Sequence, residues 1–121
     1  MDKHKRPKIT SGRTYKVTTG CGSIYITPCY DGDTLIEVFA TLGKAGGCAH
    51  CQLEAITRSI SLGLKYRIPA DEYIRQLRGI RCPSAALDSG KEILSCPDAI
   101  VKVLGGEFDS ESSNDNPSKV S

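Results

Sequence analysis

The spacing of hydrophobic residues changes partway along this chain of 121 residues, and that change limits the folds it can adopt. Apolar and polar residues alternate in segments 14–19 and 23–27, and segment 35–41, Leu-Ile-Glu-Val-Phe-Ala-Thr, is a third candidate strand. Alternation favours β-strands, because successive side chains of a strand point to opposite faces of a sheet. Turn sequences rich in Gly and Asp separate the three segments: Gly20-Cys21-Gly22 and Tyr30-Asp31-Gly32-Asp33. This part of the chain therefore predicts an antiparallel three-stranded meander.

Helical spacing follows the last of these segments. Four apolar residues recur at intervals of three and four, namely Leu53, Ile56, Ile60 and Leu64. They predict a helix over about 47–66, and a second helix, with a proline and two acids at its start, ends at Gly79. A loop is expected over 81–92, after which Ser95 or Cys96 caps a short third helix. The expected fold class is α+β, a small antiparallel three-stranded meander packed with two or three helices.

Charge is unevenly distributed along the chain. Residues 1–16 carry six Lys or Arg and one acid, residues 17–104 carry nine of each sign, and residues 105–121 carry four acids and one Lys. We expect a disordered basic arm over 1–13, one domain over 14–104 and a disordered acidic tail after it. A basic arm can also contact phosphates, but no nucleic-acid partner is expected.

Apolar runs in the chain are short. None approaches the roughly 18 residues that a membrane-spanning helix needs, and no hydrophobic segment of a signal peptide follows the basic start. The sequence therefore predicts a cytoplasmic protein without a membrane partner.

Six cysteines make the chain cysteine-rich for a reducing compartment, where thiols serve metal binding or redox chemistry more often than disulfides. Four of them lie at the predicted ends of elements: Cys21, Cys48, Cys82 and Cys96. If the fold brings these four thiols together, they supply a tetrahedral site for zinc. The intervals between them differ from those of compact zinc ribbons, so buried structural thiols and redox thiols stay open as alternatives.

The start of the long predicted helix carries a second candidate site. Cys48 and Cys51 form a Cys-x-x-Cys pair, and a helix N-terminus stabilises the thiolate of the first cysteine. The pair is thus a candidate for catalytic dithiol chemistry. His50, between them, is either a metal ligand, an acid–base group or an ordinary solvent-facing side chain.

A glycine-rich segment precedes the same helix. Gly43, Lys44, Gly46 and Gly47 are candidates for a phosphate-binding nest, since glycines let successive N–H groups face an anion and Lys44 adds charge. A nucleotide is then a candidate partner. The alternative is a strand-to-helix turn that needs close packing, and the spacing is not that of a Walker motif.

Three short sequences resemble a known family: Gly43-Lys44-Ala45-Gly46-Gly47-Cys48, Arg81-Cys82-Pro83 and Ser95-Cys96-Pro97-Asp98. They are similar to the TSCPD domain, which occurs near the C-terminus of adenosylcobalamin-dependent ribonucleotide reductases. The resemblance extends from about Gly20 to Ile100. In that family only the first cysteine of the Cys48/Cys51 pair is expected, so His50 and Cys51 depart from the pattern.

The resemblance implies a role in deoxyribonucleotide synthesis, in which ribonucleoside diphosphates are reduced, adenosylcobalamin starts the radical and dithiols return electrons. A chain of 121 residues cannot form the large barrel of such an enzyme, so catalysis by this chain alone is not expected. We expect an accessory or thiol- or metal-stabilised binding module, with a reductase catalytic subunit as a candidate partner. A small dithiol redox protein using Cys48 and Cys51 is the alternative.

Overall fold

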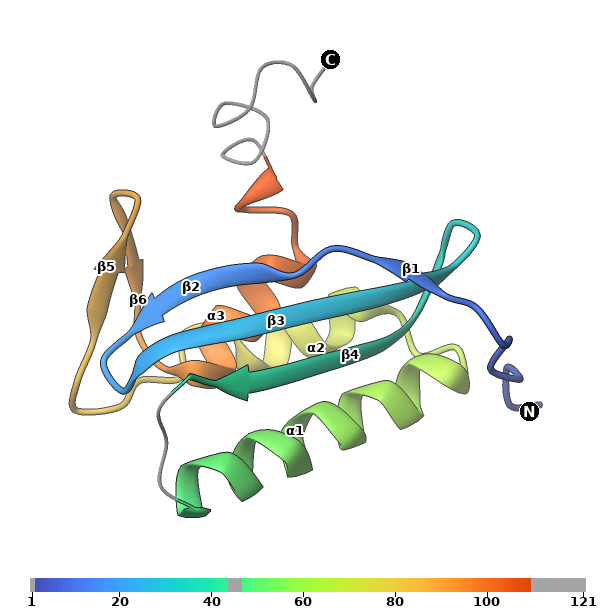
Figure 1. Cartoon of the computed structure of the whole chain (residues 1–121), viewed down its shortest axis with the longest axis horizontal. Helices are drawn as coiled ribbons and strands as arrows, with labels where there is room; N and C mark the ends of the chain where they lie inside the picture. Colours follow the sequence, from blue (N-terminus) through green and yellow to red (C-terminus); the bar gives the residue numbers. More distant parts are fainter. Residues whose placement is uncertain (1, 44–46, 110–121) are drawn as a thin grey trace.

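The computed structural model describes residues 2–43 and 47–109. Within these ranges, strands come first and helices later, with a short hairpin before the last helix (Figure 1). The elements are β1 (Ser11–Gly12), β2 (Tyr15–Thr19), β3 (Gly22–Asp31), β4 (Thr34–Leu42), α1 (Gly47–Lys65), α2 (Ala70–Leu77), β5 (Ala86–Asp88), β6 (Lys91–Ile93) and α3 (Cys96–Leu104). The predicted α+β class is confirmed.

The main sheet contains the predicted meander. β3 pairs antiparallel with β2 along one edge and with β4 along the other. The short strand β1 also pairs with β3, on the same edge as β2. The turn between β2 and β3 is short, because Thr19 pairs with Gly22, and the turn between β3 and β4 joins Asp31 to Thr34. Gly32 has a φ of +63° there, a conformation that glycine adopts without strain.

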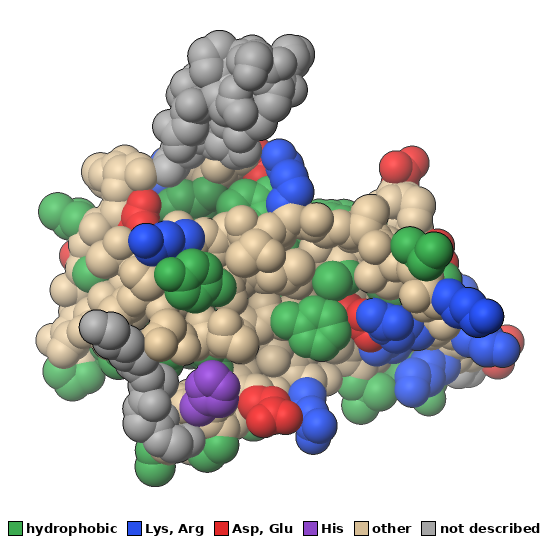
Figure 2. Space-filling view, in the orientation of Figure 1, with side chains coloured by type: hydrophobic (Ala, Val, Ile, Leu, Met, Phe, Trp, Pro, Cys, Tyr) green, Lys and Arg blue, Asp and Glu red, His purple; other side chains and the backbone are tan. Residues whose placement is uncertain are grey.

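One face of this sheet forms the core. α1 runs beside β4, whereas α2 and α3 lie behind the sheet in the view of Figure 1. Fully buried aliphatic side chains from the sheet, from α1 and from α3 meet in one cluster, including Val17, Ile24, Ile26, Leu53, Ile60 and Ile100. On the opposite face, hydrophobic side chains are scattered among polar ones (Figure 2). The alternation seen in the sequence therefore reflects a sheet that is covered on one side.

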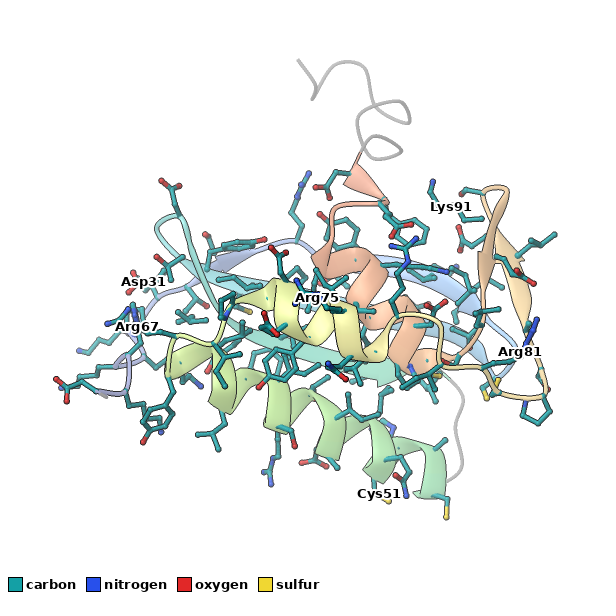
Figure 3. The ribbon with its side chains drawn as sticks, turned by 180° about the vertical axis from the view of Figure 1, so that it is seen from behind. Asp31, Cys51, Arg67, Arg75, Arg81 and Lys91 are labelled. Atoms are coloured by element: carbon teal, nitrogen blue, oxygen red, sulfur yellow. The ribbon has the colours of Figure 1, made fainter. Side chains whose placement is uncertain are left out.

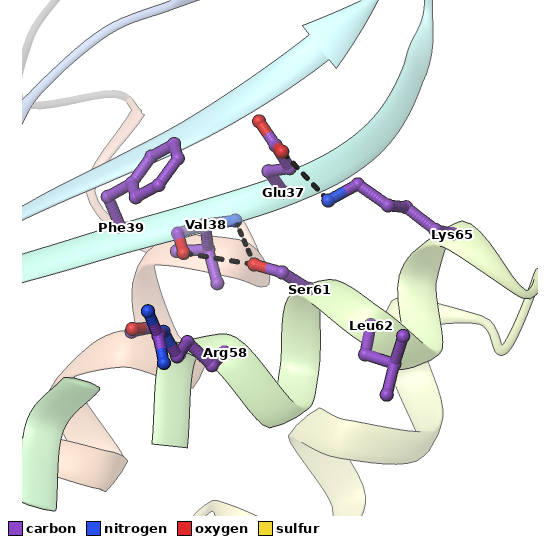
Figure 4. A pocket seen from close by; sticks show the side chains of 8 residues that line it. Glu37, Val38, Phe39, Arg58, Ser61, Leu62 and Lys65 are labelled. Atoms are coloured by element: carbon purple, nitrogen blue, oxygen red, sulfur yellow. Dashed lines mark hydrogen bonds and ion pairs between the residues drawn. The ribbon is translucent and has the colours of Figure 1, made fainter. Parts of the chain in front are cut away.

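The outer edge of β4 is closed by a side chain of α1. The Ser61 hydroxyl accepts a hydrogen bond from the Val38 N–H at 3.0 Å and donates one to the Val38 carbonyl at 3.1 Å (Figure 4). Unpaired backbone groups on an edge strand invite pairing with other chains. At Val38, α1 satisfies both groups, which fixes the helix against the edge of the sheet.

The sequence predicts a loop over 81–92. In the structure, a β-hairpin begins within this segment at Ala86 and ends at Ile93. β5 and β6 pair antiparallel, with Asp88 opposite Lys91. Ser89 and Gly90 both have positive φ, at 53° and 79°, as a two-residue hairpin turn requires. The expectation of an irregular loop is therefore wrong. The strands have three residues each, too few for alternation to be recognised in the sequence.

Both ends of the described chain contact the body of the domain, and the disorder expected for 1–13 and 105–121 stays a prediction. In the N-terminal part, the Arg6 guanidinium bonds the Glu37 carboxylate at 2.9 Å and the His4 ring contacts Asp31 at 2.8 Å. After α3, Phe108 returns to the core and is 5% exposed. Composition alone does not reveal these contacts, because their partners lie far away in the sequence. Residues 110–121 of the predicted tail lie outside the described residues.

Candidate functional site

Three of the four candidate zinc ligands lie on segments that pack together. Cys21 lies in the turn between β2 and β3, Cys82 in the connection from α2 to β5, and Cys96 is the first residue of α3. The Cys82 N–H donates to the Leu94 carbonyl at 3.0 Å, which holds the connection beside the residues that precede Cys96. A Cβ atom on Gly20 would overlap the backbone of Ser84, so the same connection also packs tightly against the β2–β3 turn.

Thr19 joins two of these thiol-bearing segments. Its buried hydroxyl oxygen accepts a hydrogen bond from the Cys21 N–H at 3.1 Å and faces the Cys96 sulfur at 4.0 Å. Burial raises the pKa of the Cys96 thiol, the hydrogen bond to Thr19 lowers it, and the neighbouring thiols of Cys21 and Cys82 raise it further. The segments that carry Cys21, Cys82 and Cys96 therefore pack together, and we call these three cysteines the thiol cluster.

Asp98 holds two of the segments that carry the thiol cluster. Its carboxylate is fully buried and accepts hydrogen bonds from the Gly79 N–H at 2.9 Å, the Leu94 N–H at 3.0 Å and the Lys102 ammonium at 2.7 Å. Burial would raise the pKa of Asp98, but these three donors outweigh it, so the pKa lies below its ordinary value. Asp98 thereby ties the chain before Cys82 to the start of α3.

Ser95 also links the segment before Cys82 to the start of α3. Its hydroxyl caps α3 by accepting from the Asp98 N–H at 3.2 Å, and it donates to the Ile80 carbonyl at 2.6 Å. The predicted cap at this position is therefore confirmed. The sequence Ser95-Cys96-Pro97-Asp98 combines a helix cap, a thiol and a buried anchor within one turn.

Cys48 and Cys51 occupy the first turn of α1, and the side chains of both are exposed. The Cys51 thiol donates to the Cys48 carbonyl at 3.3 Å. Figure 3 places Cys51 near the start of α1 and Arg81 near the base of the hairpin. Cys48 thus lies on α1, whereas Cys21, Cys82 and Cys96 lie on the β2–β3 turn, the connection after α2 and the start of α3.

The thiol cluster is not arranged as a metal site. Among residues 2–43 and 47–109, no group of three or more His, Cys, Asp or Glu side chains is positioned to hold a metal ion. Zinc coordination by Cys21, Cys48, Cys82 and Cys96 therefore stays a prediction that requires these side chains to reorient.

The predicted phosphate nest is only partly described. Lys44 and Gly46 lie outside the described residues. The Gly43 N–H donates to the Ser23 carbonyl at 3.0 Å, so this donor is engaged by the sheet, and Gly47 begins α1. Of the two interpretations of this segment, the strand-to-helix turn agrees with the contact made by Gly43. Binding of a phosphate stays a prediction.

A second buried carboxylate was not among the candidate residues. Glu37, on β4, is 5% exposed and bonds the Arg6 guanidinium at 2.9 Å and the Lys65 ammonium at 2.8 Å. Burial would raise its pKa, but Lys65 and Arg6 outweigh this effect and lower it. The signal in the sequence was a charge inside an otherwise apolar strand. Glu37 borders a hollow of about 240 Å³ between β4 and α1 (Figure 4).

The chain was compared with known proteins. A family model described as the TSCPD domain matches residues 2–107. A vitamin B12-dependent ribonucleotide reductase of Agrobacterium fabrum is 27% identical over 108 residues, which cover 88% of this chain and 8% of that protein. The protein of that name from Streptantibioticus cattleyicolor is 30% identical over 88 residues, covering 72% of this chain and 15% of the relative. The chain thus spans less than a sixth of the length of these relatives.

No solved structure gave a significant match. In the part of the chain that the structure describes, no helix is long and apolar enough to cross a membrane.

Proposed function

Because the chain belongs to the TSCPD domain family, we propose that it acts as an accessory module in vitamin B12-dependent ribonucleotide reduction. The observation that carries this proposal is the family match over residues 2–107, which includes every helix and strand described. The relatives extend far beyond the matched segment, so we assign catalysis to their remaining parts. The partner that follows from this assignment is a ribonucleotide reductase catalytic polypeptide in the cytoplasm.

Cobalamin is assigned to that partner. The hollows described on this chain have volumes of about 240 to 330 Å³. Sites for drug-sized ligands have volumes of about 300 to 1,000 Å³. Cobalamin is larger than such ligands, so the described hollows do not fit it, and no step of the reaction is assigned to this chain.

Binding and activity assays test the accessory role. The reductase polypeptide encoded in the same genome would be purified without its own TSCPD segment and titrated with this chain by calorimetry. We expect saturable binding and a change in deoxyribonucleotide formation in the presence of adenosylcobalamin and a dithiol. The chain alone should form no deoxyribonucleotide. Absence of binding, together with unchanged activity, would refute the accessory role.

We further propose that Cys21, Cys82, Cys96 and Cys48 bind zinc and thereby stabilise the module. The proposal is supported by the shared neighbourhood of the first three thiols and by the anchoring of their segments through Asp98. Zinc binding displaces thiol protons. Because the pKa of Cys96 is raised, zinc affinity should fall steeply as the pH falls from 8 to 6.

Native mass spectrometry of protein purified without chelator tests this site. We expect about one zinc ion per chain. Cys82→Ser and Cys96→Ser should lose the zinc, whereas the matched variant Cys51→Ser should retain it. A folded protein that stays free of metal after zinc is added would rule out the site.

Dithiol chemistry at Cys48 and Cys51 is the second candidate function, and the exposure of both thiols on one helical turn favours it. A working pair should form an internal disulfide reversibly, with Cys48 labelled first by iodoacetamide at mildly acidic pH. Slow labelling of Cys48 that accelerates after a chelator is added would assign this thiol to zinc instead.

A further inference from the structure

Cys21 and Cys96 are brought together by the fold although they are far apart in the sequence. The Thr19 hydroxyl bonds the Cys21 N–H at 3.1 Å and faces the Cys96 sulfur at 4.0 Å, so both residues border one buried atom. Their segments are held by separate contacts, Gly20 against Ser84 and Asp98 against Leu94.

The other four thiols are less suitable partners for this pair. Cys29 is buried at 7% exposure, and its thiol faces the Thr27 carbonyl at 3.8 Å. Cys48 and Cys51 lie on the first turn of α1, where Cys51 contacts the Cys48 carbonyl. The Cys82 N–H donates to the Leu94 carbonyl, whereas Thr19 contacts both Cys21 and Cys96.

We propose that Cys21 and Cys96 are a thiol–disulfide exchange site, which small disulfides such as oxidised glutathione convert reversibly to an internal disulfide. The inference does not rest on the proposed accessory role or on zinc. It assigns a two-electron redox function to two cysteines that are outside the Cys-x-x-Cys pair.

The two thiols have different accessibility and therefore different roles. Cys21 is exposed in a turn and meets the oxidant first. Its thiolate attacks one sulfur of glutathione disulfide, forming a mixed disulfide and releasing one glutathione thiolate. Cys96 is partly buried and less accessible to the oxidant, so it acts second as the resolving thiol.

In the second step, Cys96 resolves the mixed disulfide between Cys21 and glutathione. The Cys96 thiolate attacks the Cys21 sulfur, the bond to glutathione breaks, and a second glutathione thiolate leaves. The two protons of the protein thiols pass to the two glutathione thiolates through solvent. In total, two protein thiols and one glutathione disulfide give one protein disulfide and two glutathione molecules.

Peptide mapping of the full-length chain tests this assignment. A Cys29→Ala background leaves a single thiol in the tryptic peptide 17–44, and the peptide 92–102 contains only Cys96. The reduced protein, freed of metal with a chelator, would be equilibrated with mixtures of oxidised and reduced glutathione and quenched with an alkylating agent. We expect the 17–44 and 92–102 peptides to be linked as the main internal disulfide, and dithiothreitol to release them.

Matched variants separate this pair from its neighbours. Cys21→Ser and Cys96→Ser should abolish the linked peptides, whereas Cys82→Ser and Cys51→Ser should retain them. Urea unfolding of each reduced variant identifies any that fails to fold, and Cys21→Ala and Cys96→Ala replace such a variant. A main disulfide between Cys48 and Cys51, one that contains Cys82, or mixed glutathione disulfides alone would overturn the assignment.

The outcome can be distinguished from that of the zinc and accessory proposals. A linked pair in metal-free protein supports the exchange site even if native mass spectrometry finds no zinc. If zinc binds to the same thiols, it should slow formation of the Cys21–Cys96 disulfide at least tenfold, because bound thiolates are withheld from the oxidant.

Discussion

Asp98 and Glu37 are both buried carboxylates that contact a lysine, but they organise their surroundings differently. Asp98 bonds two backbone N–H groups as well as Lys102, whereas Glu37 bonds two cationic side chains, Arg6 and Lys65. Backbone donors are fixed by the path of the chain, so Asp98 determines how two segments approach each other. Glu37 instead attaches the N-terminal segment and the end of α1 to the sheet.

The cationic partners of the two carboxylates also differ in their exposure to solvent. The Lys102 and Lys65 side chains are 10% and 14% exposed, whereas the Arg6 side chain is 46% exposed, so only the Glu37 network has a partner in solvent. Buried ion pairs are strongly coupled and are screened little by salt, whereas exposed ion pairs contribute little to the free energy of unfolding. The comparison therefore teaches that the Asp98 network supports the segments of the thiol cluster, whereas the Glu37 network attaches the N-terminal segment to the sheet.

The largest effect is expected from Asp98→Asn. The substitution preserves shape but leaves Lys102 as a buried charge without its partner, which costs about 3–5 kcal/mol of unfolding free energy. Urea denaturation measures this loss, with Glu54→Gln as the control, because the exposed Glu54–Arg58 pair contributes within about 0.5 kcal/mol. Equal stability of Asp98→Asn and the parent chain would contradict the anchoring role.

A smaller loss is expected from Glu37→Gln. Lys65 is mostly buried and loses its partner, but Arg6 can turn to solvent, so the expected cost is about 1–3 kcal/mol. Urea denaturation again measures the change. Hydrogen exchange should show faster exchange in residues 2–12, while the amides of Gly79 and Leu94 stay protected. A loss larger than that of Asp98→Asn would reverse the comparison.

Acidification should weaken both networks. The pKa values of Asp98 and Glu37 are lowered by folding from ordinary values of 3.8 and 4.5, so the unfolded chain binds more protons in this range. Their stabilisation is complete above the ordinary values and is lost as the pH falls through the folded ones. Unfolding free energies measured between pH 7 and pH 3 should therefore fall below about pH 4.5, and less so in an Asp98→Asn, Glu37→Gln double variant.

The smallest effect is expected from Arg6→Ala. Lys65 still compensates Glu37, and the half-exposed Arg6 contributes about 0.5–1 kcal/mol, less at high salt. Urea denaturation at 0.05 M and 1 M salt tests this expectation. If the difference between variant and parent were the same at both salt concentrations, Arg6 would act through packing instead.

Local sequence patterns were sufficient for the main elements. Alternation predicts the first two strands of the meander, and the spacing of Leu53, Ile56, Ile60 and Leu64 predicts a helix that the structure describes as α1, Gly47–Lys65. These predictions succeed because a strand or helix depends on residues within a few positions of one another. The cap at Ser95 is also a local contact, with Asp98 three residues later.

Longer-range features were not evident in the sequence. The β5–β6 hairpin is short, and Phe108 lies in a segment whose composition predicted a disordered tail, although the side chain fills the core. Glu37 was recognisable as a charge in an apolar strand, but its partner Arg6 is 31 residues away. No local pattern identifies such a partner.

The sequence by itself determined the order and type of the main elements, the family resemblance and the list of thiols. Only the tertiary structure decided which thiols are neighbours. Cys21, Cys82 and Cys96 meet because the β2–β3 turn, the connection after α2 and the start of α3 are packed through Gly20, Thr19 and Asp98. These contacts join segments that are far apart in the chain, and their positions depend on how the sheet and helices bury their apolar faces together.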